Sequence, residues 1–252
     1  MTQIAKKILV VDDEPINLEL ITEFLPTEYE VHTANNGKEA LAKVEEVSPD
    51  LILLDVMMPG IDGYEVCRKL KNDSRTLFIP VVMVTALSDT ENRIQAIEAG
   101  ADDFLSKPVD MYELNARVKS LLRVKQYHDD LEEMKSRYME LYDFAPVGYF
   151  TFTRDGIIRE ANMIGAVLLG VLRQELINTG FERFVVPEDQ KVWNSHLSDA
   201  LNNWQEQSCE LKLRQENDST LFVRLSSVRM ETMDAEPEVR TVMTDLTQHE
   251  NK

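Results

Sequence analysis

The stretch LILLDVMMPGIDGYE, from Leu51 to Glu65, contains the pattern that decides the fold. Leu51 to Leu54 form a continuous apolar run, as strands covered on both faces do. The run ends at a carboxylate, Asp55, and turn-forming proline and glycine residues come soon after it. A charged side chain at the end of a buried strand is expected where that strand end contributes to a site.

Four further strand-like runs lie before residue 110, and a helical pattern follows each strand. Together with the first run, the expected strands are Lys7–Val11, Val31–Ala34, Leu51–Leu54, Val81–Thr85 and Phe104–Ser106. The expected helices are Pro15–Leu25, Gly37–Val47, Tyr64–Asn72, Asp89–Ala99 and one that begins at Met111. This alternation predicts an α/β fold with a doubly wound, five-stranded parallel sheet.

Polar residues stand at the carboxyl ends of four of these strands. They are Asp12, Asp13, Asp55, Thr85 and Lys107. The carboxyl ends of parallel strands share one edge of the sheet, so we expect these side chains to converge. Three carboxylates in a small space repel one another unless a cation lies among them, and a set of oxygen ligands suits Mg²⁺. With an ammonium and a hydroxyl beside them, they predict a phosphoryl pocket in which Asp55 is the nucleophile.

Four segments carry a resemblance to a known family. VVDDEP, LLDVMMPGIDGYE, VVMVTALSD and GADDFLSKP occur in the order found in response-regulator receiver domains, and the resemblance covers residues 5–124. It implies a flavodoxin-like fold in which Asp55 accepts a phosphoryl group from a histidine kinase or a phosphotransfer protein. The other implied roles are Mg²⁺ binding for Asp12 (through water), Asp13, Asp55 and the Met57 carbonyl, phosphoryl binding for Thr85 and Lys107, and switching for Phe104 and a cis Pro108.

The resemblance also implies how phosphorylation acts. Thr85 would reach the phosphoryl oxygens and draw the loop after strand four inward, and Phe104 would rotate into the vacated space. The face around helix four, strand five and helix five would then change. Because such faces form two-fold dimers in many receivers, we expect a symmetric homodimer.

The formal net charge of −18 is spread over both halves of the chain, and no run is basic. We therefore expect no direct binding to nucleic acid or to an anionic membrane. The N-terminus shows no apolar signal segment, and no apolar run approaches the roughly 20 residues that span a bilayer, which predicts a cytoplasmic protein. Cys67 and Cys209 lie far apart in the sequence and are expected to be free thiols.

No proline or glycine occurs from Met111 to Tyr142, so the fifth helix is expected to continue beyond the first domain. Apolar residues in its second half are spaced alternately three and four apart. They are Val124, Tyr127, Leu131, Met134, Tyr138 and Leu141. This spacing predicts a coiled-coil signalling helix over residues 125–142. The alternative is a single amphipathic helix that packs on its own domain.

From residue 143 the pattern changes to antiparallel strands. GYFTFTRDGIIREAN predicts a hairpin, and short helices are expected between Met163 and Leu201. Three strands with alternating apolar residues follow, near Gln207–Arg214, Leu221–Met230 and Val239–Thr244. With APVGYFTFTRDGIIREAN, LLGVLRQELIN, FVVPED and VMTDLT, this order resembles a PAS sensor domain, an α+β fold, over residues 143–248. The expected domains are a receiver at 1–124, the helix at 125–142 and a PAS domain at 143–252.

The PAS resemblance implies either a small ligand held between sheet and helices or a dimerising relay. The light-sensing branch binds flavin beside a reactive helical cysteine, and residues 163–201 contain none, so we expect no flavin photochemistry. Haem would need an axial histidine. His196 is the one candidate in that segment, but a half-exposed histidine on an amphipathic helix is common, so haem is not expected. The sequence leaves the ligand open.

These observations predict a two-component response regulator in which phosphorylation of Asp55 changes dimerisation or the relay through the helix. We expect no catalysis on external substrates. One alternative is the N-terminal sensory fragment of a larger histidine kinase or diguanylate cyclase, although no motif of either is present. Another is a sensor with an idle receiver. A third is a Mg²⁺-dependent acyl-phosphate phosphatase or dehalogenase, which would carry a second acid where this chain has Met57.

Overall fold

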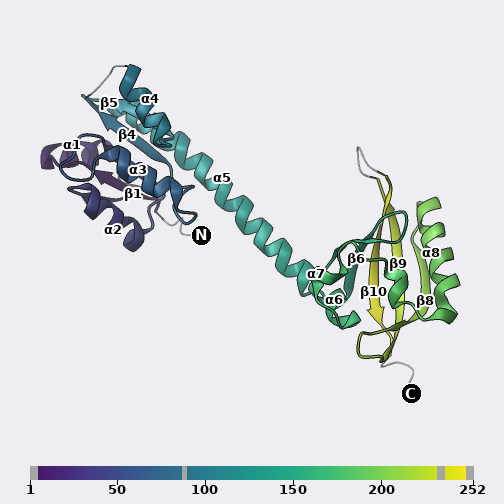
Figure 1. Cartoon of the computed structure of the whole chain (residues 1–252). Coiled ribbons are helices and arrows are strands. Elements are labelled where there is room, and N and C mark those ends of the chain that lie inside the picture. Colours follow the sequence, from purple (N-terminus) through teal and green to yellow (C-terminus); the bar gives the residue numbers. More distant parts are fainter. Residues whose placement is uncertain (1–4, 87–89, 232–235, 248–252) are drawn as a thin grey trace. The chain divides into compact units, whose positions relative to one another are not determined.

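The computed structural model describes residues 5–86, 90–231 and 236–247 of the chain (Figure 1). The chain divides into two compact units, Met1–Glu133 and Met134–Lys252. Each unit contains one five-stranded sheet, and the long helix α5, Met111–Asp143, crosses the division. No helix within the described ranges is both long enough and apolar enough to cross a membrane.

The first unit has the doubly wound α/β architecture that the sequence predicts. Its parallel strands lie in the order β2-β1-β3-β4-β5. They are β1 (Lys7–Val11), β2 (Glu30–Ala34), β3 (Leu51–Asp55), β4 (Val81–Thr85) and β5 (Asp103–Ser106). The helices are α1 (Pro15–Phe24), α2 (Gly37–Val47), α3 (Gly63–Asn72), α4 (Thr90–Glu98) and the first part of α5. Asp89, the expected first residue of the fourth helix, lies outside the described residues.

Strand β3 shows why helices must cover both faces of this sheet. All five of its residues are buried. Leu51 and Leu53 pack into a cluster with residues of α1 and α5, whereas Ile52 and Leu54 pack into a second cluster with residues of α2 and α3. Successive side chains of a strand point to opposite faces, so a continuous apolar run needs an apolar layer on each side. Each buried side chain of this kind stabilises the fold by about 1.5–3 kcal/mol.

Helix α5 is 33 residues long, which corresponds to about 50 Å. Its first turns are anchored in the first unit by the buried side chains of Leu114, Val118 and Leu122. The predicted seam residues beyond them are each 60–71% exposed; they are Val124, Tyr127, Leu131, Met134, Tyr138 and Leu141. This exposure contradicts the alternative in which the helix packs its apolar stripe on its own domain. Pairing of the stripe with a second helix stays a prediction.

The second unit is built on an antiparallel sheet, as predicted. Its strands lie in the order β7-β6-β10-β9-β8, and they are β6 (Gly148–Phe152), β7 (Ile158–Ala161), β8 (Gln207–Arg214), β9 (Thr220–Met230) and β10 (Glu238–Asp245). The helical segments are α6 (Met163–Leu169), α7 (Arg173–Leu176), the 3-10 turns η1 (Phe181–Phe184) and η2 (Pro187–Asp189), and α8 (Gln190–Asn202). The β6–β7 hairpin turns at Gly156, whose φ of 76° is accessible to glycine without strain.

Aromatic side chains fill much of the space between this sheet and its helices. Phe150 and Phe152 of β6 contact Phe181, and Phe152 and Phe181 contact Trp193 of α8, with ring centroids 4.7–5.7 Å apart. All four side chains are at most 2% exposed. Such contacts add about 0.5–1.5 kcal/mol per pair to the effect of burial. This aromatic cluster therefore forms the centre of the second core.

The expectation that His196 is half-exposed is wrong. His196 is 5% exposed, because it lies on the same face of α8 as Trp193, one turn away, and this face packs on the sheet. Its Nε2 lies 2.7 Å from Ser227 Oγ, which in turn lies 2.7 Å from Thr241 Oγ1. Burial lowers the pKa of His196, and nearby Asp199 acts in the opposite direction. The imidazole is a hydrogen-bonded core residue, so its Nε2 is not free to bind haem iron.

Asn162 ties the end of α5 to the second unit. Its side chain is fully buried. Nδ2 donates hydrogen bonds to the carbonyls of Tyr142 at 2.7 Å and Val147 at 3.0 Å. Oδ1 accepts hydrogen bonds from the N–H groups of Tyr149 and Gly165, both at 2.8 Å. The carboxamide thus makes all four hydrogen bonds open to it, and it joins the last turn of α5 to β6 and α6.

Candidate functional site

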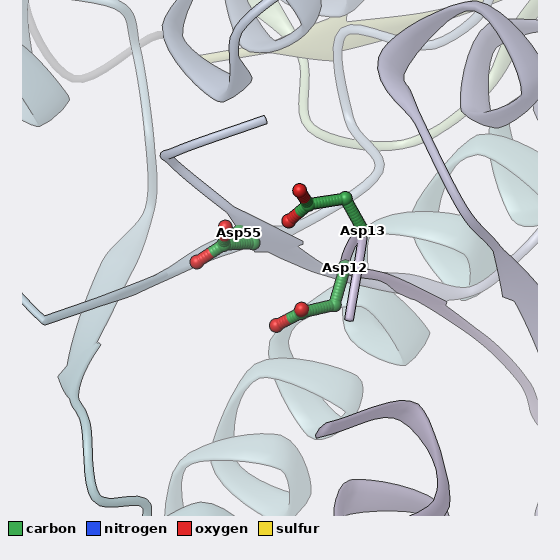
Figure 2. Close-up of side chains that lie close together, drawn as sticks. All are labelled: Asp12, Asp13 and Asp55. Carbon is green, nitrogen blue, oxygen red and sulfur yellow. The ribbon is translucent and has the colours of Figure 1, made fainter. Parts of the chain in front are cut away.

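Three carboxylates from two neighbouring strands meet at the carboxyl edge of the first sheet. Asp12 and Asp13 directly follow β1, and Asp55 is the last residue of β3, which pairs with β1. Each residue offers a carboxylate oxygen within 4.8 Å of the others. Figure 2 shows the three side chains lying close together at the strand ends. The fold thus brings together the acids that the sequence singles out.

Asp12 is held in place by several hydrogen bonds. It is 1% exposed. Its Oδ1 accepts hydrogen bonds from the Glu14 N–H at 3.0 Å and from Asn17 Nδ2 at 2.9 Å, and its Oδ2 accepts one from Lys107 Nζ at 2.7 Å. Asn17 has no motif of its own. An amide in the first turn of the helix that follows a site aspartate is, however, a signal that could have identified it.

Lys107 is shared by two of the carboxylates. Its Nζ lies 2.7 Å from both Asp12 and Asp55. Burial acts to lower the pKa of Lys107, but the hydrogen bonds to the two carboxylates outweigh it and raise that pKa. Burial also raises the pKa of Asp55, and Lys107 offsets this only in part. One ammonium among three acids leaves surplus negative charge in the pocket, which a divalent cation would balance.

Thr85 lies one strand further along the same edge. It is the last residue of β4 and is buried, and the register places its neighbour Val84 opposite Asp55. The Thr85 carbonyl accepts a hydrogen bond from the Lys107 N–H at 2.8 Å, so β4 helps to position the lysine. Met57, two residues after Asp55, has a side chain that is 64% exposed. The role of its carbonyl as a metal ligand stays a prediction.

Phe104, the expected switch residue, is half-buried on β5 and packs against the core. The Arg117 guanidinium of α5 lies 5.8 Å from the centre of its ring. Arg117 also pairs with Asp103 at 2.6 Å and with Glu113 at 2.7 Å. The peptide bond before Pro108 is cis, as the resemblance implies. Phe104 is therefore in contact with α5, while its switching stays a prediction.

Gly63 belongs to the support of this site although the sequence did not single it out. A Cβ at Gly63 would lie 2.3 Å from the carbonyl oxygen of Asp55 and 2.9 Å from Cα of Val56. The Gly63 N–H donates a hydrogen bond to the Val56 carbonyl at 3.0 Å. The start of α3 therefore packs directly on the backbone that carries Asp55, and only glycine fits there. The glycine of IDGYE was the available signal.

The ligand set of this pocket fits Mg²⁺. All the candidate donors are oxygens, and Asp13 is exposed, so water can complete the coordination shell. Asp12, Asp13 and Asp55 would hold the ion, which supplies charge compensation to phosphoryl oxygens when bound. Within the described residues, no other group of three His, Cys, Asp or Glu side chains is placed to hold a metal ion.

Comparison with known proteins adds independent findings. Residues 8–119 match the family described as response regulator receiver domain. Over 131 residues the chain is 53% identical to response regulator PleD of Caulobacter vibrioides, a match that covers 52% of this chain and only 29% of PleD. A solved CheY-like receiver domain protein from Methanospirillum hungatei is 32% identical with a TM-score of 0.46, covering 49% of this chain and 98% of that one. A solved PAS domain of an HTR-like protein from Haloarcula marismortui is 22% identical with a TM-score of 0.43, and the match covers 48% of this chain and 98% of that one.

Proposed function

Residues 8–119 of this chain are a response regulator receiver domain, and from that premise we propose that the protein is a two-component response regulator with Asp55 as phosphoacceptor. The observation that carries the proposal is the Lys107 ammonium, 2.7 Å from both Asp12 and Asp55. It holds a fixed positive charge where the oxygens of an incoming phosphoryl group would lie. The donor would be a histidine kinase or a phosphotransfer protein, the partners from which receiver domains take their phosphoryl groups.

The reaction is a transfer from one side chain to another. A carboxylate oxygen of Asp55 attacks the phosphorus of a phosphohistidine, the O–P bond forms as the N–P bond breaks, and the imidazole leaves with the electron pair. Lys107 would exchange its contact with Asp55 for one with a phosphoryl oxygen while it keeps Asp12. The Thr85 hydroxyl would donate to another phosphoryl oxygen.

Intact-mass measurement after incubation with acetyl phosphate tests the proposal. With Mg²⁺ we expect the wild type to gain the mass of a single phosphoryl group, and Asp55→Asn to gain none. Removal of Mg²⁺ with EDTA should largely abolish the gain. Asp155→Asn, which changes an exposed aspartate of the second unit, is the matched control and should react like the wild type. Modification that persists in Asp55→Asn would contradict the assignment.

We propose that the protein accepts a phosphoryl group on Asp55 and does not catalyse the hydrolysis of external phosphate esters. The position two residues after Asp55 holds Met57, whose apolar side chain cannot protonate a leaving group. Steady-state hydrolysis of p-nitrophenyl phosphate should therefore stay at background in the wild type. A hydrolysis rate that is present in the wild type and lost in Asp55→Asn would instead favour a phosphatase.

The signal is proposed to leave the receiver through α5. Arg117 of this helix contacts the Phe104 ring and pairs with Asp103, so rotation of Phe104 would change how α5 is held. The seam residues of α5, 60–71% exposed in the single chain, are proposed to pair with those of a second copy in a coiled coil. The protein would then act as a homodimer.

We propose that the second unit is a PAS-type relay domain. Support comes from its order of two strands, helices and three strands, and from the sheet order β7-β6-β10-β9-β8. The four aromatic side chains of its core leave little room for a ligand between sheet and helices. An absorption spectrum and denaturing mass spectrometry of the purified protein should therefore show no chromophore. A stoichiometric bound flavin, haem or metabolite in that core would contradict the relay.

A further inference from the structure

A groove of about 600 Å³ lies on the outer face of the second unit's sheet. Strand residues alternate between the two faces, so Tyr149 points outward while its neighbour Phe150 enters the aromatic core. The floor of the groove comes from outward-facing residues of β6, β10 and β9, among them Tyr149, Val242 and Val228. The last turns of α5 form its wall through Tyr138, Leu141 and Tyr142.

Three stacked tyrosines form the junction between wall and floor. The rings of Tyr138 and Tyr142 lie 6.0 Å apart at 11°, and those of Tyr142 and Tyr149 lie 5.7 Å apart at 10°. Burial, with a smaller contribution from Glu160, raises the pKa of Tyr142 to about 12, so its hydroxyl stays uncharged. The stack joins the helix firmly to the sheet at this point.

The groove continues the exposed seam of α5. Tyr138 and Leu141 are the last two seam residues, 64% and 71% exposed, and both line the groove. On the floor, Val228 is 37% exposed. An uncovered apolar surface therefore runs from the helix onto the sheet. A continuous apolar surface of this kind on a single chain marks an interaction site, whereas scattered apolar residues do not.

We propose that a second copy of this chain fills the groove, in a parallel two-fold dimer that places the partner's Leu141 against Val228. The inference rests on the coiled-coil pairing proposed above. Parallel helices bring equivalent seam positions into one layer, so the partner's Leu141 arrives beside Leu141, at the mouth of the groove. If the two helices instead ran antiparallel, with the centres of their seams side by side, the partner's Val124 would lie beside Leu141.

Charges next to the seam favour the parallel arrangement. Asp130 precedes the seam residue Leu131 and Lys135 follows Met134, so they occupy the flanking positions whose interhelical pairs set orientation in parallel coiled coils. Asp130 of each copy would meet the partner's Lys135, an attraction that occurs twice in the dimer. These charge pairs favour the same parallel arrangement that would cover the apolar surface running from the seam into the groove.

Arg240 provides the positive charge of the groove, whose lining also contains Glu160 and Glu206. It lies opposite Val228 in the β10–β9 register and lines the groove. Its backbone pairs with β6 and β9, but its side chain makes no hydrogen bond or ion pair within the described part of the chain. In the parallel dimer the carboxyl end of the partner's α5 comes to this level, and a helix end of that kind is negative. The guanidinium thus gains a partner on association.

Light scattering of the full chain and of two matched variants tests whether a second copy fills the groove. Val228→Asp and Val192→Asp change valines that are 37% and 39% exposed, on the outer face of the sheet and on α8. We expect Val228→Asp to raise the Kd of the dimer about tenfold or more, because a carboxylate would be buried in the interface. Val192→Asp should dimerise like the wild type. A monomeric wild type or equal effects of the two variants would overturn the proposal. So would a small molecule that native mass spectrometry detects on the wild type and on Val192→Asp but not on Val228→Asp.

Crosslinking tests the orientation. Chains carrying Val228→Cys are mixed with chains carrying either Leu141→Cys or Val124→Cys and treated with a short bismaleimide. The native thiols are free, and burial raises the pKa of Cys67 to about 11 and of Cys209 to about 12, so both should react slowly. A crosslink to Leu141→Cys is expected, and preferential crosslinking to Val124→Cys would overturn the parallel dimer.

The same samples separate this inference from the proposed function. Phosphorylation by acetyl phosphate depends on the first unit alone and is followed by intact mass on each variant. Normal phosphorylation without a dimer would refute the groove contact and leave the response regulator proposal standing. A dimer with the expected crosslink but no modification at Asp55 would refute the phosphoacceptor and leave the groove contact standing.

Discussion

The Lys107 ammonium lies 2.7 Å from the Asp55 carboxylate, yet burial still raises the pKa of Asp55 above its ordinary value. The lysine divides its charge between Asp55 and Asp12 and therefore compensates the burial of Asp55 only in part. Such an incomplete balance is common at functional sites, because the missing charge is supplied by what the site binds. In this pocket a bound cation would supply the missing positive charge. The imbalance without a cation can be measured as a change in the free energy of unfolding.

Asp55→Asn should stabilise the first unit at pH 7 in EDTA, because it removes a buried carboxylate whose charge is compensated only in part. The folded pKa of Asp55 is raised above 3.8, so the unfolded chain loses this proton first. The wild type therefore loses stability relative to the variant as the pH rises from 3.8 through the folded pKa. Mg²⁺ should stabilise the wild type more than the variant. Urea unfolding followed by far-UV circular dichroism measures both effects.

Asp50→Asn is the control for that experiment. The Asp50 carboxylate accepts hydrogen bonds from Lys6 Nζ at 3.1 Å and from the Lys7 N–H at 2.8 Å, so its replacement should destabilise. If both Asp50→Asn and Asp55→Asn destabilised the first unit, the pocket would not carry the surplus negative charge inferred from Asp55.

Gly63→Ala should reduce both stability and phosphorylation. The new Cβ would meet the Asp55 carbonyl at 2.3 Å, so either α3 or the end of β3 must shift. We expect a loss of about 1–3 kcal/mol and slower modification by acetyl phosphate, measured by urea unfolding and intact mass. Gly180→Ala, where a Cβ meets nothing within 4 Å, should change stability by less than about 0.5 kcal/mol. Unchanged phosphorylation in Gly63→Ala would contradict the close packing.

Asn162→Ala should destabilise the second unit by about 2–3 kcal/mol. The change leaves the carbonyls of Tyr142 and Val147 and the N–H groups of Tyr149 and Gly165 without their buried partner. Tryptophan fluorescence during urea unfolding reports this unit, because both tryptophans of the chain lie in it. Asn202→Ala, which changes an exposed asparagine, serves as the control. If it destabilised the second unit as much as Asn162→Ala does, the four hydrogen bonds of Asn162 would not have the stabilising role given to them.

His196 should make the stability of the second unit depend on pH. Burial lowers its folded pKa below 6.5, so as the pH falls the unfolded chain takes up the proton first. Stability is therefore highest above pH 6.5 and declines below it, until the folded imidazole is protonated as well. The urea concentration at the midpoint of unfolding, followed by fluorescence, should therefore decrease as the pH is lowered from about 7.5 to about 5. The decline should be smaller in His196→Gln and unchanged in His32→Gln, and an undiminished decline in His196→Gln would exclude this imidazole as its source.

The sequence alone determined the architecture of both units and the place of the acidic pocket. Continuous apolar runs such as Leu51–Leu54 indicate strands covered on both faces, and alternation such as that of Gln207–Arg214 indicates a sheet with one face outward. Both patterns are local and follow from backbone periodicity. The site followed in turn, because parallel strands deliver the residues at their carboxyl ends to one edge, which is how Asp12, Asp55 and Lys107 come together.

Only the tertiary structure decided the contacts that depend on which surfaces meet. It showed that Gly63 touches the Asp55 carbonyl, that Asn17 holds Asp12, and that His196 faces inward instead of being half-exposed. It also showed that the α5 seam runs into a groove on the sheet. Helical periodicity names the faces of a helix, but which face is buried is settled by packing against segments distant in the sequence, and that packing is a property of the whole fold.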